Sequence, residues 1–414
     1  MVRFGRLGAL VFGHFLTDCY MGMVLPLVPI IQERFGLTLA ATGLIAVVTS
    51  LTGSLVQPFL GILSDMTRRS YLVGLGVMLT GVGICTFGMA STFWGMMVLI
   101  ALGGLGCGAF HPPGSALASA AGGERRDLTQ ALFSPGGIVG YSLGPVLGMW
   151  LYHARGLEGM WPGMVFGLVA GPVVGLASRS LEGGKGDAHP APPPPVHRNG
   201  ELMSRRHRAG ALSLLIAVVF LRSASVIVFC SYLALLLKHR GLPESRWDWV
   251  IMAFVFAGGV AGIVGGQLTR VLGRRWLTVV SMGLAGPALL GFVHTEGLAS
   301  WALLILGGAA VQAAVPVNIV QAQLLLPRHQ SLASALMMGF CWGAAAFLTP
   351  VFGRIADVTS LPFSLSLSCI IPVLSAALAL FLPDLAPTAP ALTSAEPPPL
   401  PPPPVHDVVG AEGE

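Results

Sequence analysis

Four ionisable side chains lie inside long apolar stretches of the sequence, where a charge is costly unless it serves a purpose. His14 and Asp18 stand four residues apart in the first stretch, and His111 and Arg222 lie in two later ones. An ionised side chain at membrane depth costs roughly 2.5–3.5 kcal/mol or more, so such residues are candidates for function. A carboxylate and an imidazole on one helix face can share a proton, and an arginine can bind an anion. We therefore predict proton coupling at Asp18 and His14, and substrate binding at Arg222 and His111.

Both assignments have a structural alternative. Arg222 lies at the depth of Asp18 in its own apolar stretch, so the two side chains could instead form a permanent ion pair that fixes helix packing. His111 is followed by Pro112 and Pro113, which should disrupt the helix and free backbone carbonyls. A histidine at that point could therefore be a packing residue that donates a hydrogen bond to a freed carbonyl.

Amide side chains extend this polar set and are expected to line the same site. We add to the substrate-binding candidates Gln57, Gln312, Asn318 and Gln321. Each of them, taken alone, could equally make a hydrogen bond between two helices, which is common inside membranes.

The elements that must position these groups are long apolar helices. Hydrophobic residues make up 54% of the chain and charged residues 10%, whereas soluble domains carry roughly 25% charged residues. The apolar residues occur in blocks of about 20, the length that crosses ~30 Å of hydrocarbon, and in lipid such blocks must be helices because every backbone amide needs an internal partner. We predict an all-α membrane protein with twelve transmembrane helices, at 7–31, 39–63, 71–90, 93–118, 128–152, 160–178, 210–237, 247–269, 276–294, 300–326, 331–353 and 362–383.

The two halves of the chain resemble each other at one constant shift of 205 residues. Gly61–Asp65 aligns with Gly266–Arg270, and Pro145–Gly148 aligns with Pro350–Gly353. Two separate matches at one shift indicate duplication, although chance similarity among glycine-rich helices is the alternative. Six-helix repeats around a site at mid-membrane are a common plan of secondary transporters.

The repeat predicts four segments along the chain. They are an N-terminal six-helix bundle at 1–178, a flexible cytoplasmic linker at 179–209, a C-terminal six-helix bundle at 210–383 and a disordered proline-rich tail at 384–414. The linker and the tail are too polar and too rich in proline to form a core.

The distribution of lysine and arginine predicts the orientation in the membrane. If the N-terminus is cytoplasmic, sixteen of the 23 basic residues lie on the cytoplasmic side and six on the other. This bias predicts a multi-pass protein of the bacterial inner membrane with both termini in the cytoplasm. The net charge of +5 is thus a topology signal, and no basic and aromatic interleaving suggests nucleic-acid binding. We expect a monomer whose partners are lipid, protons and a small molecule.

Two groups of residues are predicted to act in gating. The loops after the second and eighth helices carry Gly61, Asp65, Arg68, Arg69, Gly266, Arg270, Arg274 and Arg275. A carboxylate and arginines beside a close helix contact could pair in one conformation and separate in the other, but the arginines could also serve only to set topology. A stripe of small residues on the fifth helix, with Gly140, Gly144, Pro145 and Gly148, predicts a tightly packed sealing helix.

Other protein classes have weaker support. The six cysteines stand in apolar stretches without CxxC spacing, so we expect no disulfide, metal or cofactor. The chain has neither HExxH nor GxSxG and is not predicted to be an enzyme. An intramembrane enzyme that uses His14, Asp18 and His111 with a metal, and a sensor that does not transport, remain the alternatives.

In these segments the chain resembles the major facilitator superfamily and, more narrowly, the fosmidomycin resistance protein group of bacterial exporters. The resemblance covers about residues 8–384 apart from the linker. It is carried by Gly13–Asp18, Gln57–Pro58 with Gly61 and Asp65, Phe110–Pro112, Gly136–Gly137 with Gly144–Pro145, Ser231–Tyr232, Leu325–Pro327, Gly353 with Ala356–Asp357, and Phe381–Asp384.

The resemblance implies twelve helices, alternating access and efflux driven by protons. Gly140, Gly144, Pro145 and Gly148 match the pattern of superfamily antiporters, which favours export. The gating loops depart from the superfamily pattern in two places. The glycine before the basic pair is missing in the first copy, and Arg270 replaces an acid in the second. The predicted function is proton-coupled antiport that exports a small anionic or amphipathic drug or metabolite, and the nearest alternative is uptake of an organic anion by proton symport.

Overall fold

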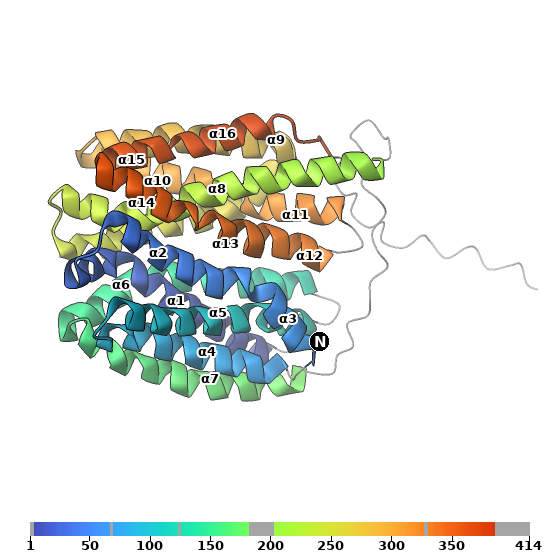
Figure 1. Ribbon diagram of the computed structural model, residues 1–414. Helices are drawn as coiled ribbons and strands as arrows, with labels where there is room; N and C mark the ends of the chain where they lie inside the picture. Colours follow the sequence, from blue (N-terminus) through green and yellow to red (C-terminus); the bar gives the residue numbers. More distant parts are fainter. Residues whose placement is uncertain (1–3, 67–68, 123–125, 182–202, 327–329, 386–414) are drawn as a thin grey trace, which may run out of the picture.

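The regular elements of the chain are helices that run side by side along one direction (Figure 1). The computed structural model describes residues 4–66, 69–122, 126–181, 203–326 and 330–385. The prediction of an all-α membrane protein is confirmed.

The helices of the first half carry the labels α1 to α7. Their bounds are α1 Phe4–Phe35, α2 Leu39–Ser50, the π-helix η1 Leu51–Leu55, α3 Gln57–Met66, α4 Arg69–Thr86, η2 Phe87–Met89, α5 Phe93–Gly122, α6 Arg126–Arg155, η4 Glu158–Gly163, α7 Met164–Ser178 and η5 Arg179–Leu181.

The helices of the second half carry the labels α8 to α16. Their bounds are α8 Arg205–His239, η6 Glu244–Arg246, α9 Trp247–His294, α10 Gly297–Ala313, α11 Val315–Leu325, α12 Gln330–Ala335, the π-helix η7 Leu336–Phe340, α13 Cys341–Ala345, α14 Leu348–Val358, α15 Leu361–Ser368 and α16 Ile370–Ala379.

Eleven stretches in the described part of the chain are long and apolar enough to cross a membrane, and each matches one predicted helix. Two of them lie within α9, on either side of the turn at Gly273, whose positive φ of 76° suits glycine. The predicted fifth span, 128–152, is α6. This helix has the necessary length, but its glycines, prolines and polar residues lower its hydropathy. The count of twelve crossings therefore stays a prediction.

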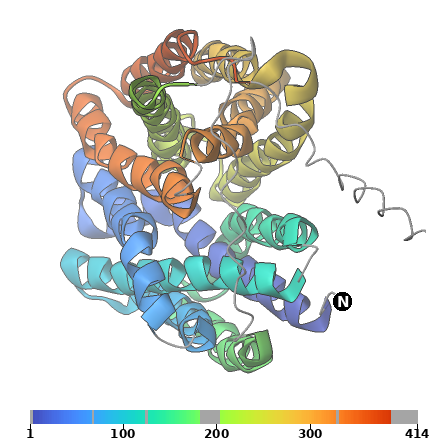
Figure 2. The same cartoon turned by 90° about the vertical axis from the view of Figure 1, so that its right-hand side faces the viewer.

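Each half packs around its own apolar core. The first core joins buried residues of α1, α2, α4, α5, α6 and α7. Two further clusters join α8 with the helices that follow it, and one of them also includes Val28 of α1. Figure 2 shows the helices of the first half, coloured from blue through teal to green, gathered below, and those of the second half, from the green of α8 through yellow to red, above. Most of the predicted linker and tail lies outside the described residues, so the segment boundaries remain a prediction.

The glycine stripe of α6 lies directly against α1. A Cβ at Gly140 or Gly144 would overlap backbone oxygens of Phe15 or Cys19, and a Cβ at Gly148 would lie 2.9 Å from Met23. Small residues let two helices approach this closely, so the stripe is a packing surface, while its role in gating remains a prediction. The stripe therefore fixes where α1, which carries His14 and Asp18, sits beside α6.

The two halves meet mainly in the part of the bundle between its middle and one end. We call that end, where α1 joins α2 and α8 joins η6, the loop end. The opposite end, where α7 ends and α8 begins, is the linker end. The halves meet through α2 and α14, α1 and α8, and α6 and α9. Toward the linker end α3 packs on α5 of its own half, and α12 packs on α11 of its own half. The conformation is thus closed at the loop end.

Candidate functional site

Asp18 of α1 contacts two histidines at once. Its Oδ2 lies 3.3 Å from Nε2 of His14, one helical turn earlier, and its Oδ1 lies 3.2 Å from Nε2 of His111 on α5. The side chains of His14, Asp18 and His111 are 11%, 18% and 24% exposed, so the site is largely buried. We call these three residues the proton cluster. The sequence predicted the pair on α1, and the tertiary structure adds His111 to it.

The other ring nitrogen of each histidine is bonded to a backbone carbonyl. Nδ1 of His14 lies 3.0 Å from the oxygen of Phe133 on α6, and Nδ1 of His111 lies 2.8 Å from the oxygen of Cys107. A carbonyl oxygen only accepts hydrogen bonds, so both Nδ1 atoms carry a proton and donate it. These bonds hold the two rings with Nε2 directed at Asp18.

The helix that carries His111 differs from its prediction. Pro112 and Pro113 were expected to disrupt it, yet α5 runs without a break from Phe93 to Gly122. This prediction is wrong. The carbonyl that His111 uses belongs to Cys107, one turn earlier on the same helix.

Close packing on α6 restricts the cluster further. The ring of His14 stacks on Phe133 at a centroid distance of 4.3 Å and on Phe110 at 5.9 Å. Gly137 faces the gap between His14 and Asp18, and a Cβ there would overlap both Nε2 and Oδ2. Glycine at this position therefore leaves the space in which the carboxylate and the imidazole meet.

Arg222 of α8 lies in the other half and is 3% exposed. Its Nη1 donates to Oε1 of Gln312 on α10 at 2.7 Å, and its Nη2 donates to Oγ of Ser223 at 3.0 Å. Among the described residues, Asp18 pairs with the two histidines and Arg222 with these two oxygens, so no Asp18–Arg222 ion pair forms in this conformation. The two predicted partners are thus held separately, one in each half.

The other predicted amides are spread over the structure. Gln57 donates to the carbonyl of Gly53 in its own helical segment at 2.7 Å. Asn318 accepts from Oγ1 of Thr278 at 3.0 Å, which is the helix-to-helix bond that was its alternative. Gln321 is fully buried, and its amide atoms have no hydrogen-bond partner among the described residues. Of the predicted amides, Gln312 is the one joined to Arg222.

The predicted gating residues near the linker end are described only in part. Arg68 and the side chains of Asp65 and Arg270 lie outside the described residues. A Cβ at Gly61 would lie 3.7 Å from Pro112, whereas Gly266 has open space beside it. Arg275 lies over the ring of Trp276 at 5.5 Å. Arg69 begins α4, and Arg274 follows the turn at Gly273. Their roles in gating remain a prediction.

A contact that the sequence did not predict closes the loop end. Asp357, at the end of α14, accepts hydrogen bonds from the backbone N–H groups of Leu39 (2.8 Å) and Ala40 (3.0 Å) at the start of α2. The hydroxyl of Tyr232 lies 3.0 Å from the oxygen of Leu39 and 2.8 Å from that of Thr349. A carboxylate at a helix N-terminus satisfies unpaired N–H groups and the helix dipole. We call these residues the loop-end latch.

Further charges reinforce the latch across the two halves. Lys238 at the end of α8 pairs with Glu33 at the end of α1, and His153 lies 4.0 Å from Glu244. Exposed pairs of this kind contribute little each, so Asp357 and Tyr232 are the main elements. Tyr232 and Asp357 stand in segments that carried the family resemblance, and that was the one sequence signal for them.

Replacing Asp357 by asparagine should open the latch in a larger fraction of molecules. Asparagine has one acceptor oxygen for two N–H groups and no charge at the start of α2, and loss of such a cap costs roughly 0.5–2 kcal/mol. The population open at the loop end should rise about two- to thirtyfold. Spin labels at Ala154 and Leu298, which lie near the loop end in opposite halves, would report a larger share of long distances.

A matched control for this measurement is Glu158→Gln. Glu158 is an exposed carboxylate near the same end, but it pairs with Arg34 of its own half at 2.9 Å. Its replacement should leave the distance distribution unchanged. Equal distributions for Asp357→Asn and the parent protein would show that the latch does not hold the closed end.

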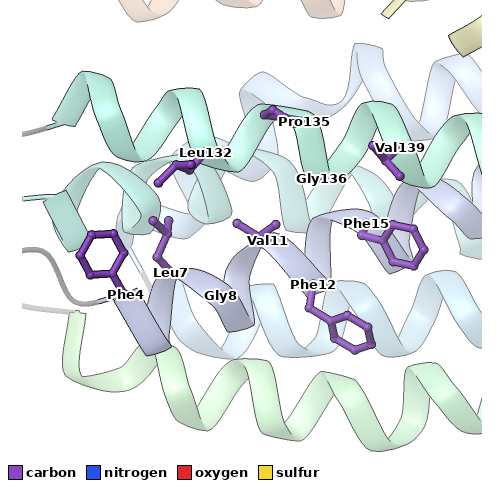
Figure 3. Close-up of a pocket in the computed structure, with 10 residues that line it drawn as sticks. All are labelled: Phe4, Leu7, Gly8, Val11, Phe12, Phe15, Leu132, Pro135, Gly136 and Val139. Carbon is purple, nitrogen blue, oxygen red and sulfur yellow. The ribbon is translucent and has the colours of Figure 1, made fainter.

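A pocket of about 560 Å³ lies between α1 and α6 (Figure 3). Its wall is formed by Phe4, Leu7, Gly8, Val11, Phe12, Phe15, Leu132, Pro135, Gly136 and Val139. None of these side chains offers a hydrogen-bond donor or a charge, so the pocket suits an apolar group and is not an anion site.

Comparison with known proteins gives one consistent result. The major facilitator superfamily profile matches residues 10–331 and 215–410. The fosmidomycin resistance protein of Escherichia coli K12 is 28% identical over 386 residues, which are 92% of this chain and 93% of that protein. The multidrug resistance protein MdtG of Escherichia coli is 30% identical over 152 residues, 35% of this chain and 37% of that protein.

Solved structures agree on the fold. A bacterial homologue of the human lysosomal transporter Spinster, in an inward-facing and occupied conformation, superposes with a TM-score of 0.71 at 16% identity, covering 94% of this chain and 99% of that one. With the helical architecture and the profile match, this establishes the family. The chain belongs to the major facilitator superfamily and is a multi-pass membrane transporter.

Proposed function

We propose that the chain is a proton-coupled antiporter that exports a small anionic or amphipathic drug or metabolite. The observation that carries the proposal is the arrangement of charges, with Asp18 held between two histidines in one half and Arg222 held by Gln312 in the other. The first set can exchange protons and the second can bind an anion. The similarity to the fosmidomycin resistance protein favours export and an anionic phosphonate as the first compound to test.

The bias of basic residues toward the linker side supports an orientation with the linker end in the cytoplasm. In that orientation the conformation described above is closed toward the periplasm. Cytoplasmic substrate would reach Arg222, and the proton cluster would release protons into the cytoplasm. Opening of the loop-end latch would then expose both sites to the periplasm, where substrate leaves and protons bind again.

The direction of coupling makes such export efficient. When an anion leaves the cell in exchange for entering protons, net positive charge moves inward. Both the pH gradient and the membrane potential therefore drive the exchange, since one elementary charge is worth about 2.3 kcal/mol per 100 mV.

A second candidate is uptake of an organic anion by proton symport. One observation favours symport. A protonated cluster and Arg222 would both be positive and would attract an anion together. Proteoliposomes with an imposed pH difference distinguish the two candidates. Accumulation of fosmidomycin in the acidic compartment supports antiport, whereas accumulation in the alkaline compartment means symport.

Replacing Arg222 by glutamine should weaken binding of the anionic substrate selectively. The amide keeps a hydrogen-bond donor but loses the charge, and a hydrogen bond to a charged group contributes about 1.5–3 kcal/mol. We expect the KM for fosmidomycin to rise about 10- to 100-fold. Arg222→Lys should retain part of the affinity.

The control for the Arg222 experiment is Arg246→Gln, which removes an exposed arginine near the loop end. Its KM should equal that of the parent protein. An unchanged KM in Arg222→Gln would remove Arg222 from the substrate site.

A further inference from the structure

The hydrogen bonds of the proton cluster indicate how many protons its three side chains hold. Both Nδ1 atoms donate to carbonyl oxygens, so a neutral ring presents a bare lone pair at Nε2. Each Nε2 nevertheless lies 3.2–3.3 Å from a carboxylate oxygen of Asp18, which is also an acceptor. Two acceptors repel each other at this distance unless a proton, or a metal ion held by all three side chains, lies between them. With no metal ion bound, the two contacts require two protons beyond those on Nδ1.

The possible positions of these two protons are limited. The carboxyl group can hold one proton, so at least one histidine is an imidazolium while both contacts exist. The three side chains then carry a net charge of +1 together. Loss of one proton makes the cluster neutral and leaves one contact without a proton, and loss of the second makes it −1.

We propose that the proton cluster loads and releases two protons in each transport cycle, with His111 as a proton carrier and not a substrate contact. This inference rests on the proposed proton coupling and adds its stoichiometry. Asp18 sits between the two histidines and can pass a proton to either. Both rings are held by their bonds from Nδ1, and His14 also packs on Phe133, so the carboxylate is the part that turns away when a proton leaves.

In the part of the chain that the structure describes, the groups around the cluster do not supply another ready proton site. Among the described residues, the titratable side chains that act on Asp18 and His111 are these two themselves, His14 and Cys107. Cys107 Sγ lies 3.6 Å from Nδ1 of His111. Tyr141 on α6 and Cys19 on α1 are near enough for the charge of Asp18 to act on them. Thiols and phenols ordinarily titrate above neutral pH, whereas imidazoles titrate close to it.

The stoichiometry can be read from the limit of accumulation. In proteoliposomes with the membrane potential held at zero by potassium and valinomycin, one pH unit supports about tenfold accumulation for one coupled proton and about 100-fold for two. With the parent protein, the accumulation ratio of fosmidomycin should rise with the second power of the proton concentration ratio across the membrane. His111→Gln, whose amide nitrogen can still donate to Asp18, should follow the first power.

The control is His294→Gln, since His294 lies at the end of α9 and bonds Ser366 at 2.8 Å. It should retain the second-power dependence. A first-power dependence in the parent protein, or an unchanged power in His111→Gln, would overturn the proposal. Loss of all pH-driven accumulation in the parent protein would instead contradict the proposed function.

A second measurement tests the cluster without transport. Nitrogen-15 NMR of histidine-labelled protein, with signals assigned by His14→Gln and His111→Gln, reports the protons on each ring nitrogen. We expect protonated Nδ1 on both rings and at least one imidazolium in the acid form. Two neutral rings in that form would overturn the two-proton state, whatever the transport assay shows.

Discussion

Replacing Asp18 by asparagine should abolish pH-driven transport while the protein still folds. Asparagine has nearly the same size as aspartate and can bond both histidines, but it cannot accept a proton. Without the carboxylate between them, the two histidines cannot pass protons through the cluster. The imposed pH difference then cannot drive accumulation, which should fall to the level of liposomes without protein. Exchange of labelled for unlabelled substrate needs no proton movement and should persist.

The comparison for Asp18→Asn is Glu158→Gln, which removes an exposed carboxylate outside the proton cluster. It should transport as the parent protein does. Monodisperse gel filtration and an unfolding temperature within a few degrees of the parent would establish that Asp18→Asn is folded. Full pH-driven accumulation in that folded variant would exclude Asp18 as the proton carrier.

Replacing Gly137 by alanine should disrupt the proton cluster from the neighbouring helix. The added Cβ would overlap Nε2 of His14 and Oδ2 of Asp18, so at least one of these side chains must move. Overpacking of this kind costs about 1–3 kcal/mol. We expect a lower unfolding temperature and loss of most pH-driven accumulation, measured in the same proteoliposome assay.

Gly283→Ala is the matched control for Gly137→Ala, because a Cβ at Gly283 in α9 has nothing within 4 Å. Alanine favours a helix over glycine by up to about 1 kcal/mol, so this variant should be as stable as the parent or more so. The double variant Gly137→Ala with His14→Ala should lose less stability than the sum of the two changes, since the overlap with the imidazole is relieved. Strict additivity would place the effect of Gly137 elsewhere.

The sequence alone determined which parts of the chain are helices in the membrane and which ionisable residues lie inside them. Lipid offers no hydrogen bonds, so long apolar blocks can only be helices, and a charge inside one stands out. The pair His14–Asp18 was predictable for the same local reason, since residues four apart share a helix face. The close contact of the α6 glycine stripe with another helix was likewise visible in its spacing.

The tertiary structure decided the partners of these residues. His111 lies 93 positions from Asp18 and yet contacts it, while Arg222, at a matching depth, bonds Gln312 instead. Asp357 reaches the start of α2 from the other half. Which side chains meet across two helices depends on the depth, the rotation and the spacing of both helices. Those quantities are set by packing along the whole contact, and no local pattern in the sequence carries them.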